Sequence, residues 1–316
     1  MKLPLVTVLM PVYNAERYLE FSIESILNQT FSDFEFIIIN DGSSDNSLDI
    51  IKSYADKDNR IKVINRKNKG LVKTLNEGVK LAAGKYIARM DGDDISMPER
   101  LEKQFNYMER HRQVGIVGGY AKLVDINNNY IDDMIYPISN YFCKLALCNN
   151  TVFAHPAIFI RRQVALEFTY SALAWPAEDY ELWMRISKIW KMHNIPEFLL
   201  RYRISDESIS STNKTVQASH SIHLSSVYCD YLLNKALLIL ATTPLRRFDY
   251  NILKQEKSKQ RLADIEIGSL RKLIEKSKGI NRLILTIAFM ISFILNPRFF
   301  RTYLHNLRLL KKNYGQ

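Results

Sequence analysis

Four short apolar segments, each followed by a stretch with helical spacing, alternate along the first two thirds of the chain and constrain its fold more than any other feature. These segments, interpreted as buried strands, cover residues 6–10, 34–39, 61–64 and 86–90. Strands that alternate with helices in this way pair into a mostly parallel sheet with helices on both faces. The sequence therefore predicts an α/β fold for this region.

Polar turns follow three of the four predicted strands. They read PVYN (residues 11–14), NDGS (40–43) and DGDD (91–94). The carboxyl ends of parallel strands meet at one edge of a sheet, and ligands bind beyond that edge. We therefore expect the three turns to share the rim that holds the site.

The excess of positive charge lies entirely in the last third of the chain. The net charge is +11, yet residues 1–200 hold 24 Lys and Arg against 25 Asp and Glu, whereas residues 201–316 hold 20 against 8. Such asymmetry is typical of a near-neutral domain joined to a surface-seeking extension. The extension has no recognition-helix pattern and no interleaved aromatic residues, so no nucleic-acid partner is expected.

The basic extension is predicted to contain two helices, at residues 214–241 and 250–278, and then an uncharged run at 283–295. A spanning helix needs roughly 20 apolar residues, so this run is short for one. Two interpretations stay open: half of a buried helix hairpin, or an interfacial helix whose basic neighbours contact anionic lipid head groups. These neighbours are Arg282, Arg298 and Arg301.

Two features predict a reducing, cytoplasmic compartment. The first ten residues lack the long apolar stretch and small-residue cleavage site of a signal peptide. Cys143, Cys148 and Cys229 match neither a disulfide framework nor a zinc pattern.

Residues 91–94 (DGDD) form the densest acidic group at a predicted strand end. Carboxylates at positions i and i+2 can together hold a hard divalent cation, which would stabilise a diphosphate as a leaving group. For the tetrapeptide taken alone, a polar turn is the simpler interpretation. It would precede a helix that begins at Pro98.

Three further positions could carry chemistry. Asp41 follows a buried strand and could accept the imide hydrogen of a uracil or thymine ring, or simply form the turn. Asp179, next to Glu178, could cap a helix or act as a general base at a helix start. His155, before Pro156, is interpreted as structural rather than catalytic.

Six motifs, taken in order, make residues 4–210 resemble glycosyltransferase family 2, the inverting nucleotide-sugar enzymes with the GT-A fold. The resemblance is strongest to bacterial members that build O-antigen, capsule and other surface polysaccharides. The motifs are VTVLMPVYNAE (6–16), IIINDGSSD (37–45), NKGLVKTLNEG (68–78), AGKYIARMDGDDISMPER (83–100), AEDYELWMR (177–185) and LLRYRISDESIS (199–210).

With this resemblance, the expected organisation is a GT-A catalytic domain at residues 1–210, a helical extension at 211–278 and a basic, apolar membrane-associating segment at 279–316. The GT-A domain implies the mostly parallel sheet flanked by helices that the strand pattern already predicts.

The resemblance also implies roles for the residues that match the family's motifs. Asp179 would be the general base. Asp93 and Asp91 would hold Mn²⁺ or Mg²⁺ at the donor diphosphate, and Asp41 would contact the base. Donor-binding residues would be Pro11, Val12, Tyr13, Glu16, Asp41, Lys73, Asp91 and Asp93, and acceptor-side residues would be Glu178, Asp94 and His155.

One departure from the family pattern concerns the metal. Members often carry a His two residues after a Tyr-Arg pair as a further metal ligand. Here Tyr202-Arg203 is followed at that distance by Ser205. That ligand is then absent or replaced by water, so the affinity for the metal depends on the remaining acids.

The activity implied is inverting transfer of a sugar from a nucleotide-diphosphate donor, a UDP-sugar, to a hydroxyl of a polyprenyl-linked glycan in bacterial surface-polysaccharide synthesis. A lipid-linked acceptor implies peripheral contact with the inner face of the plasma membrane. Two alternatives are a sugar-nucleotide nucleotidyltransferase and a non-enzymatic membrane-surface protein. The first would need a Gly-rich, basic loop after the first strand, and PVYN (11–14) is not one.

Overall fold

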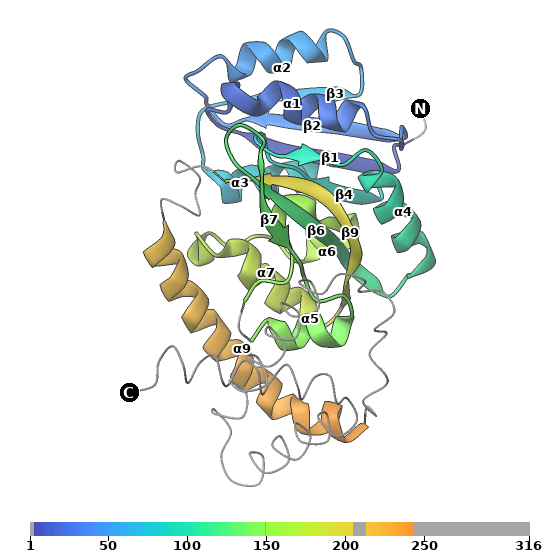
Figure 1. Cartoon of the computed structure of the whole chain (residues 1–316), viewed down its shortest axis with the longest axis vertical. Coiled ribbons are helices and arrows are strands. Elements are labelled where there is room, and N and C mark those ends of the chain that lie inside the picture. The colour runs from blue at the N-terminus through green and yellow to red at the C-terminus, as the bar shows by residue number, and fades with distance from the viewer. Residues whose placement is uncertain (1–2, 149, 205–212, 243–316) are drawn as a thin grey trace.

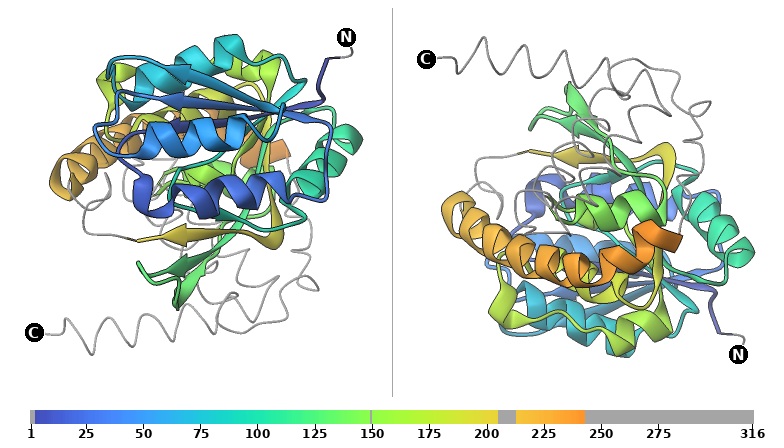
Figure 2. Two further views of the ribbon diagram at one scale, coloured as in Figure 1. Left: turned by 90° about the horizontal axis from the view of Figure 1, so that it is seen from above. Right: turned by 90° about the horizontal axis from the view of Figure 1, so that it is seen from below.

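The computed structural model describes residues 3–148, 150–204 and 213–242 (Figure 1). Within them, nine strands form one sheet in the order β3-β2-β1-β4-β8-β6-β9-β5, with β7 paired to β6. Helices cover both faces of this sheet, as two further views show (Figure 2). The predicted α/β fold, with a mostly parallel sheet between helices, is confirmed.

The first half of the sheet is parallel, and its strands lie where the apolar segments predict them. β1 pairs with β2 and β4, and β2 pairs with β3, all in parallel. The elements in chain order are β1 (Val6–Val12), α1 (Glu16–Leu27), β2 (Phe34–Asn40), α2 (Ser47–Ala55), β3 (Ile61–Asn65), α3 (Leu71–Leu81) and β4 (Tyr86–Arg89).

The second half of the sheet is mixed, which the sequence pattern does not predict. β8 runs antiparallel between β4 and β6, and β6 runs parallel to β9. The elements are β5 (Ile95–Ser96), α4 (Arg100–Arg110), β6 (Val114–Val124), β7 (Tyr130–Met134), α5 (Asn140–Ala146), β8 (Phe159–Arg161), α6 (Arg162–Glu167), α7 (Glu178–Ser187) and β9 (Lys191–Arg203). Two short 3-10 turns, His155–Ala157 and Ala172–Ala174, complete this part.

Helix α4 begins at Arg100 and not at Pro98, so that prediction is wrong by two residues. The N–H of Met97 donates to the carbonyl of Leu199 at 2.9 Å, which continues the pairing of β5 with β9. The chain is therefore still extended at Met97 and must turn before the helix can start.

Side chains of the central strands alternate between two cores, one on each face of the sheet. On β1, Leu9 packs with residues of α3, α6 and α7, whereas Val8 and Met10 pack with residues of α1, α2 and α4. This alternation follows from the period of two along a strand. It fixes the sheet between its two helical layers, so the strand ends form a stable rim.

Helix α9 (Lys214–Thr242) packs against the core that contains α7. Tyr228 and Leu232 are buried in that core, and the hydroxyls of Tyr228 and Ser187 lie 2.7 Å apart. A helix at 214–241 is therefore confirmed, while the domain division at residue 210 stays a prediction. The segments 250–278 and 283–295 lie outside the described residues. Among the helices described here, none is long and apolar enough to cross a membrane.

Candidate active site

The loop after β4 brings three carboxylates together at the carboxyl edge of the sheet. Asp91, Asp93 and Asp94 each offer one ligand atom, and these atoms lie within 4.8 Å of one another. Asp91 and Asp93 are half-buried and Asp94 is 2% exposed. A Cβ on Gly92 would come within 3.3 Å of the Cβ of Ala15, so glycine allows the loop to pack closely against the start of α1.

Burial and the charges of neighbouring acids raise the pKa values of Asp93 and Asp94. The pKa of Asp93 is raised to about 6, first by burial and then by the charge of Asp91. Burial and the charge of Asp93 also raise the pKa of Asp94. The buried Oδ2 of Asp94 has no hydrogen-bond partner within the described part of the chain. A hard divalent cation would supply that partner and relieve the repulsion, so these residues fit Mn²⁺ or Mg²⁺.

Two buried arginines contact this acidic loop. Arg89 Nη1 donates to Asp91 Oδ2 at 2.5 Å, and the Arg89 side chain is only 5% exposed. Arg203, at the end of β9, donates from its backbone N–H to Asp94 Oδ1 at 2.8 Å. Its Nε donates to the backbone carbonyl of Asp93, also at 2.8 Å. The loop is thus fixed both from its own strand and from β9.

The first turn of α7 holds two more acids, Glu178 and Asp179. Glu178 is buried, and its pKa is raised to about 7, first by burial and then by the charge of Asp179, to which Asp91 adds. The pKa of Asp179 is also raised by burial and is lowered in part by the charge of Arg89. Because the charges of Asp91 and Arg89 act on this pair, the start of α7 lies near the loop after β4.

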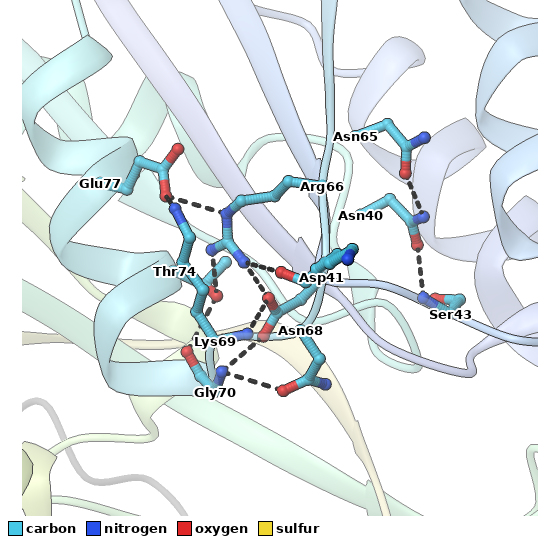
Figure 3. A network of polar contacts seen from close by, with 11 residues as sticks. Asn40, Asp41, Ser43, Asn65, Arg66, Asn68, Lys69, Gly70, Thr74 and Glu77 are labelled. Carbon is cyan, nitrogen blue, oxygen red and sulfur yellow. Dashed lines mark hydrogen bonds and ion pairs between the residues drawn. The ribbon is translucent and has the colours of Figure 1, made fainter.

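Asp41, at the end of β2, is enclosed by the loop between β3 and α3 (Figure 3). It is 3% exposed, and Oδ1 accepts hydrogen bonds from Arg66 Nη1 and from the N–H of Lys69. Its Oδ2 accepts from the N–H of Gly70 at 2.9 Å. Arg66 also donates from Nη2 to Thr74 Oγ1, on α3, at 2.8 Å. The carboxylate therefore holds residues 66–70 against the end of β2.

The turns after β1 and β2 interlock through reciprocal hydrogen bonds. Glu16 Oε2 accepts from the N–H of Asn46 at 2.8 Å, and Asp45 Oδ2 accepts from the N–H of Glu16 at 3.0 Å. Tyr13 is 56% exposed at the same edge, while the two residues before it are buried in β1. The turn therefore presents Tyr13, on a rigid backbone, to any ligand at the rim.

Lys73 and His155 are predicted site residues that differ in their surroundings, and Ser205 stands where the family pattern often has a metal ligand. Lys73 is exposed on α3. His155 Nε2 lies 2.8 Å from the Tyr170 hydroxyl, and burial, together with the charge of Arg89, holds the pKa of His155 well below its ordinary value. His155 is therefore neutral. Ser205 lies outside the described residues.

Arg66, Arg89 and Arg203 were not among the predicted site residues. The sequence does carry a signal for Arg89, because a charged residue ends an otherwise apolar strand two positions before Asp91. Arg203 belongs to the Tyr-Arg pair of the motif at 199–210, but its contacts with residues distant in sequence have no signal there, and Arg66 has no signal of either kind.

Comparisons with known proteins identify the family of the chain. Residues 7–169 match the sequence model of glycosyl transferase family 2. An uncharacterised glycosyltransferase of Methanocaldococcus jannaschii is 40% identical over 211 residues, which cover 64% of this chain and 71% of that protein. The O-antigen biosynthesis glycosyltransferase WbnJ of Escherichia coli is 38% identical over 210 residues, which cover 65% of this chain and 82% of WbnJ.

Solved structures show the same fold at low sequence identity. S. aureus TarS 1–349, in complex with UDP-GlcNAc, aligns with a TM-score of 0.56 at 15% identity, covering 95% of this chain and 92% of that one. The mannosyltransferase PcManGT of Pyrobaculum calidifontis, in complex with GDP-Man and Mn²⁺, aligns with a TM-score of 0.53 at 12% identity, covering 100% and 89%.

Fold and site together define a glycosyltransferase with the GT-A architecture. The chain belongs to glycosyltransferase family 2. The protein is therefore an enzyme of the transferase class, and the alternatives of a nucleotidyltransferase and a non-enzymatic membrane-surface protein lose their support.

Glu178→Gln tests the burial of this carboxyl through the pH dependence of stability. The pKa of Glu178 is about 7 in the folded protein and 4.5 for an ordinary glutamate. The contribution of Glu178 to the free energy of unfolding therefore falls as the pH rises from about 4.5 to about 7. Glutamine stays neutral. In EDTA, the free energy of unfolding of the variant relative to wild type should therefore rise by about 1–3 kcal/mol between about pH 5 and pH 8.

Urea unfolding at the two pH values measures this change. Glu167→Gln, at an exposed position on α6, removes the same formal charge and should show almost no pH-dependent difference. A difference between Glu178→Gln and wild type that stays constant with pH would contradict the raised pKa.

Proposed function

We propose that the enzyme transfers a sugar from a nucleotide-diphosphate donor, a UDP-sugar, to a hydroxyl of a glycan acceptor with inversion at the anomeric carbon. The observation that carries this proposal is the meeting of two acidic groups, the Asp91–Asp94 loop and the start of α7, in one electrostatically coupled site. Sugar transfer needs a group that neutralises the leaving diphosphate and a base for the attacking hydroxyl.

In this proposal the loop after β4 serves the donor. Asp91 and Asp93 would hold Mn²⁺ or Mg²⁺, and a bound cation would neutralise charge on the diphosphate. Arg89 keeps Asp91 in place through their 2.5 Å ion pair. The complexes of PcManGT with GDP-Man and Mn²⁺, and of TarS with UDP-GlcNAc, support a nucleotide-sugar donor.

The base would be Asp179. Its Oδ1 accepts the N–H of Tyr180 at 2.7 Å, which fixes the carboxylate at the helix start. The raised pKa of Asp179 makes it a stronger base than an exposed aspartate. In this proposal the acceptor hydroxyl, deprotonated by Asp179, attacks the anomeric carbon directly, and this single displacement inverts the anomeric centre.

Asp179→Asn should lower turnover by about 10²- to 10⁴-fold while donor binding is retained, because the amide cannot accept the proton of the acceptor hydroxyl. Release of UDP in the presence of acceptor measures turnover, and calorimetry measures donor binding. Glu181→Gln, in the same helical turn and ion-paired with Arg185, is the matched control and should keep wild-type turnover. Wild-type turnover in Asp179→Asn would remove this residue from the mechanism.

Asp93→Ala should abolish Mn²⁺-dependent binding of UDP, because the cation loses a carboxylate ligand from a group of three. Calorimetric titration with UDP, in MnCl₂ and in EDTA, measures the metal-dependent part. Asp49→Asn, exposed on α2, should bind as the wild type does. If Asp93→Ala bound UDP with unchanged affinity in MnCl₂, the proposed metal site would be wrong.

We further propose that the acceptor is a polyprenyl-linked glycan of bacterial surface polysaccharide and that residues 279–316 bring the enzyme to the inner face of the plasma membrane. The similarity to WbnJ, an O-antigen biosynthesis glycosyltransferase, supports the pathway class. The uncharged run at 283–295 and its arginine neighbours support contact with anionic lipid.

Removing residues 279–316 should release the enzyme from vesicles that contain anionic phospholipid, because the basic and apolar contacts are lost together. Co-sedimentation of the full and shortened chains measures this, with vesicles of neutral phospholipid as the control. Equal pelleting of both chains with anionic vesicles would contradict membrane contact through this segment.

A further inference from the structure

Arg203 joins three parts of the molecule through one buried side chain. The residue is 4% exposed and ends β9. Its Nε donates to the carbonyl of Asp93 at 2.8 Å, and its Nη1 donates to the carbonyl of Asp125 at 3.0 Å. Its guanidinium carbon lies 4.3 Å from the centre of the Tyr18 ring, on α1. These contacts link the acidic loop, the turn between β6 and β7, and helix α1.

Among the described residues, the acceptors for the Arg203 side chain are backbone carbonyls. A guanidinium holds its donors in a rigid planar fork, so two carbonyls bound to it are fixed in position and direction. The carbonyl of Asp93 belongs to the peptide between Asp93 and Asp94. Its direction therefore constrains where both carboxylates point.

The loop needs such a restraint because its carboxylates repel one another in the conformation that it adopts. Three carboxylates whose ligand atoms lie within 4.8 Å of one another repel, and residues 91–94 form no helix or strand that would hold them. Arg89 fixes only Asp91 among them. The backbone N–H of Arg203 binds Asp94 Oδ1, and its side chain binds the Asp93 carbonyl, so β9 fixes the other two acids.

We propose that Arg203 is a positioning residue that shapes the loop of residues 91–94 for a divalent cation without contacting the cation itself. This inference rests on the metal site of the proposed function. Groups that orient metal ligands typically contribute about 10- to 100-fold to metal affinity. They act before the cation binds, by lowering the cost of bringing the ligands together.

The test is the affinity of the full-length enzyme for MnCl₂ alone, measured by the electron paramagnetic resonance signal of free Mn²⁺. Arg203→Met keeps the length of the side chain and the backbone N–H but removes the donors, and should weaken Mn²⁺ binding by at least about tenfold. Turnover of Arg203→Met should return toward the wild-type value at high MnCl₂, because the ligands themselves remain.

Arg161→Met is a matched control. Arg161 also ends a strand, binds backbone carbonyls of Val114 and Met108 at 2.8 and 2.9 Å, and lies over a tyrosine ring, that of Tyr86. It pairs with the amino end of β4, opposite to the acidic loop. Arg161→Met should therefore bind Mn²⁺ as the wild type does, even if its thermal stability falls.

Arg203→Lys separates positioning from charge. A lysine keeps the positive charge but has no planar fork, so it should restore less than half of the lost binding free energy. Full restoration by Arg203→Lys would show that charge alone suffices and would overturn the positioning role. Unchanged affinity in Arg203→Met would overturn it as well.

Two further variants make the outcome decisive. If Arg203→Met does not fold, Tyr18→Leu removes only the ring beneath the guanidinium and should weaken Mn²⁺ binding by about two- to fivefold. Unchanged affinity in a folded Tyr18→Leu would then count against the inference. Asp93→Ala separates the two hypotheses: if it also binds Mn²⁺ normally, the metal site itself fails, whereas its loss beside normal binding in Arg203→Met defeats only the role of Arg203.

Discussion

The repulsion between carboxylates at the end of β4 is the constraint on which the rest of the site depends. The charge of Asp91 contributes to the raised pKa values of Asp93 and Asp94 on the same loop and of Glu178 at the start of α7. Repulsion alone would spread the acids of the loop apart. The buried arginines Arg89 and Arg203 hold this loop, and both come from strands that are themselves fixed between two packed layers. The site is therefore a property of the sheet as much as of the loop.

The two halves of the sheet contribute differently to this arrangement. The parallel half ends in turns that tie to one another: the N–H of Asp41 donates to the carbonyl of Val12 at 2.8 Å, and Gly92 packs against Ala15. The mixed half brings β9 beside β5, which places Arg203 next to the acidic loop. Helix α7 lies in the same half of the chain as β9 and carries Glu178 and Asp179 in its first turn. A ligand at this edge would meet groups from both halves at once.

Much of the parallel half could be predicted from sequence, because its strands are short apolar runs between helices with clear spacing. The acidic residues could also be singled out, since DGDD and Glu178-Asp179 stand at predicted element ends. The mixed half could not: β5 has two residues and β8 has three, too few for a period to show. The contact between Arg203 and the acidic loop could not be predicted either. Asp93 lies 110 positions away in the sequence, and the atom that accepts the hydrogen bond is its backbone carbonyl, which no sequence pattern marks. Asp41 illustrates the same limit, since its partners on the loop of residues 66–70 are mostly peptide N–H groups.

The packing of α9 bears on how far the catalytic unit extends along the chain. Ser225 donates to the carbonyl of Cys148 at 2.5 Å, and Tyr228 meets Ser187 at the end of α7, the helix that carries Asp179. A polypeptide truncated after residue 210 would expose to water the apolar surface of α7 that α9 covers. The hydroxyl of Ser187 would also lose its partner, Tyr228. The first half of α9 thus packs directly against the helix that carries Asp179.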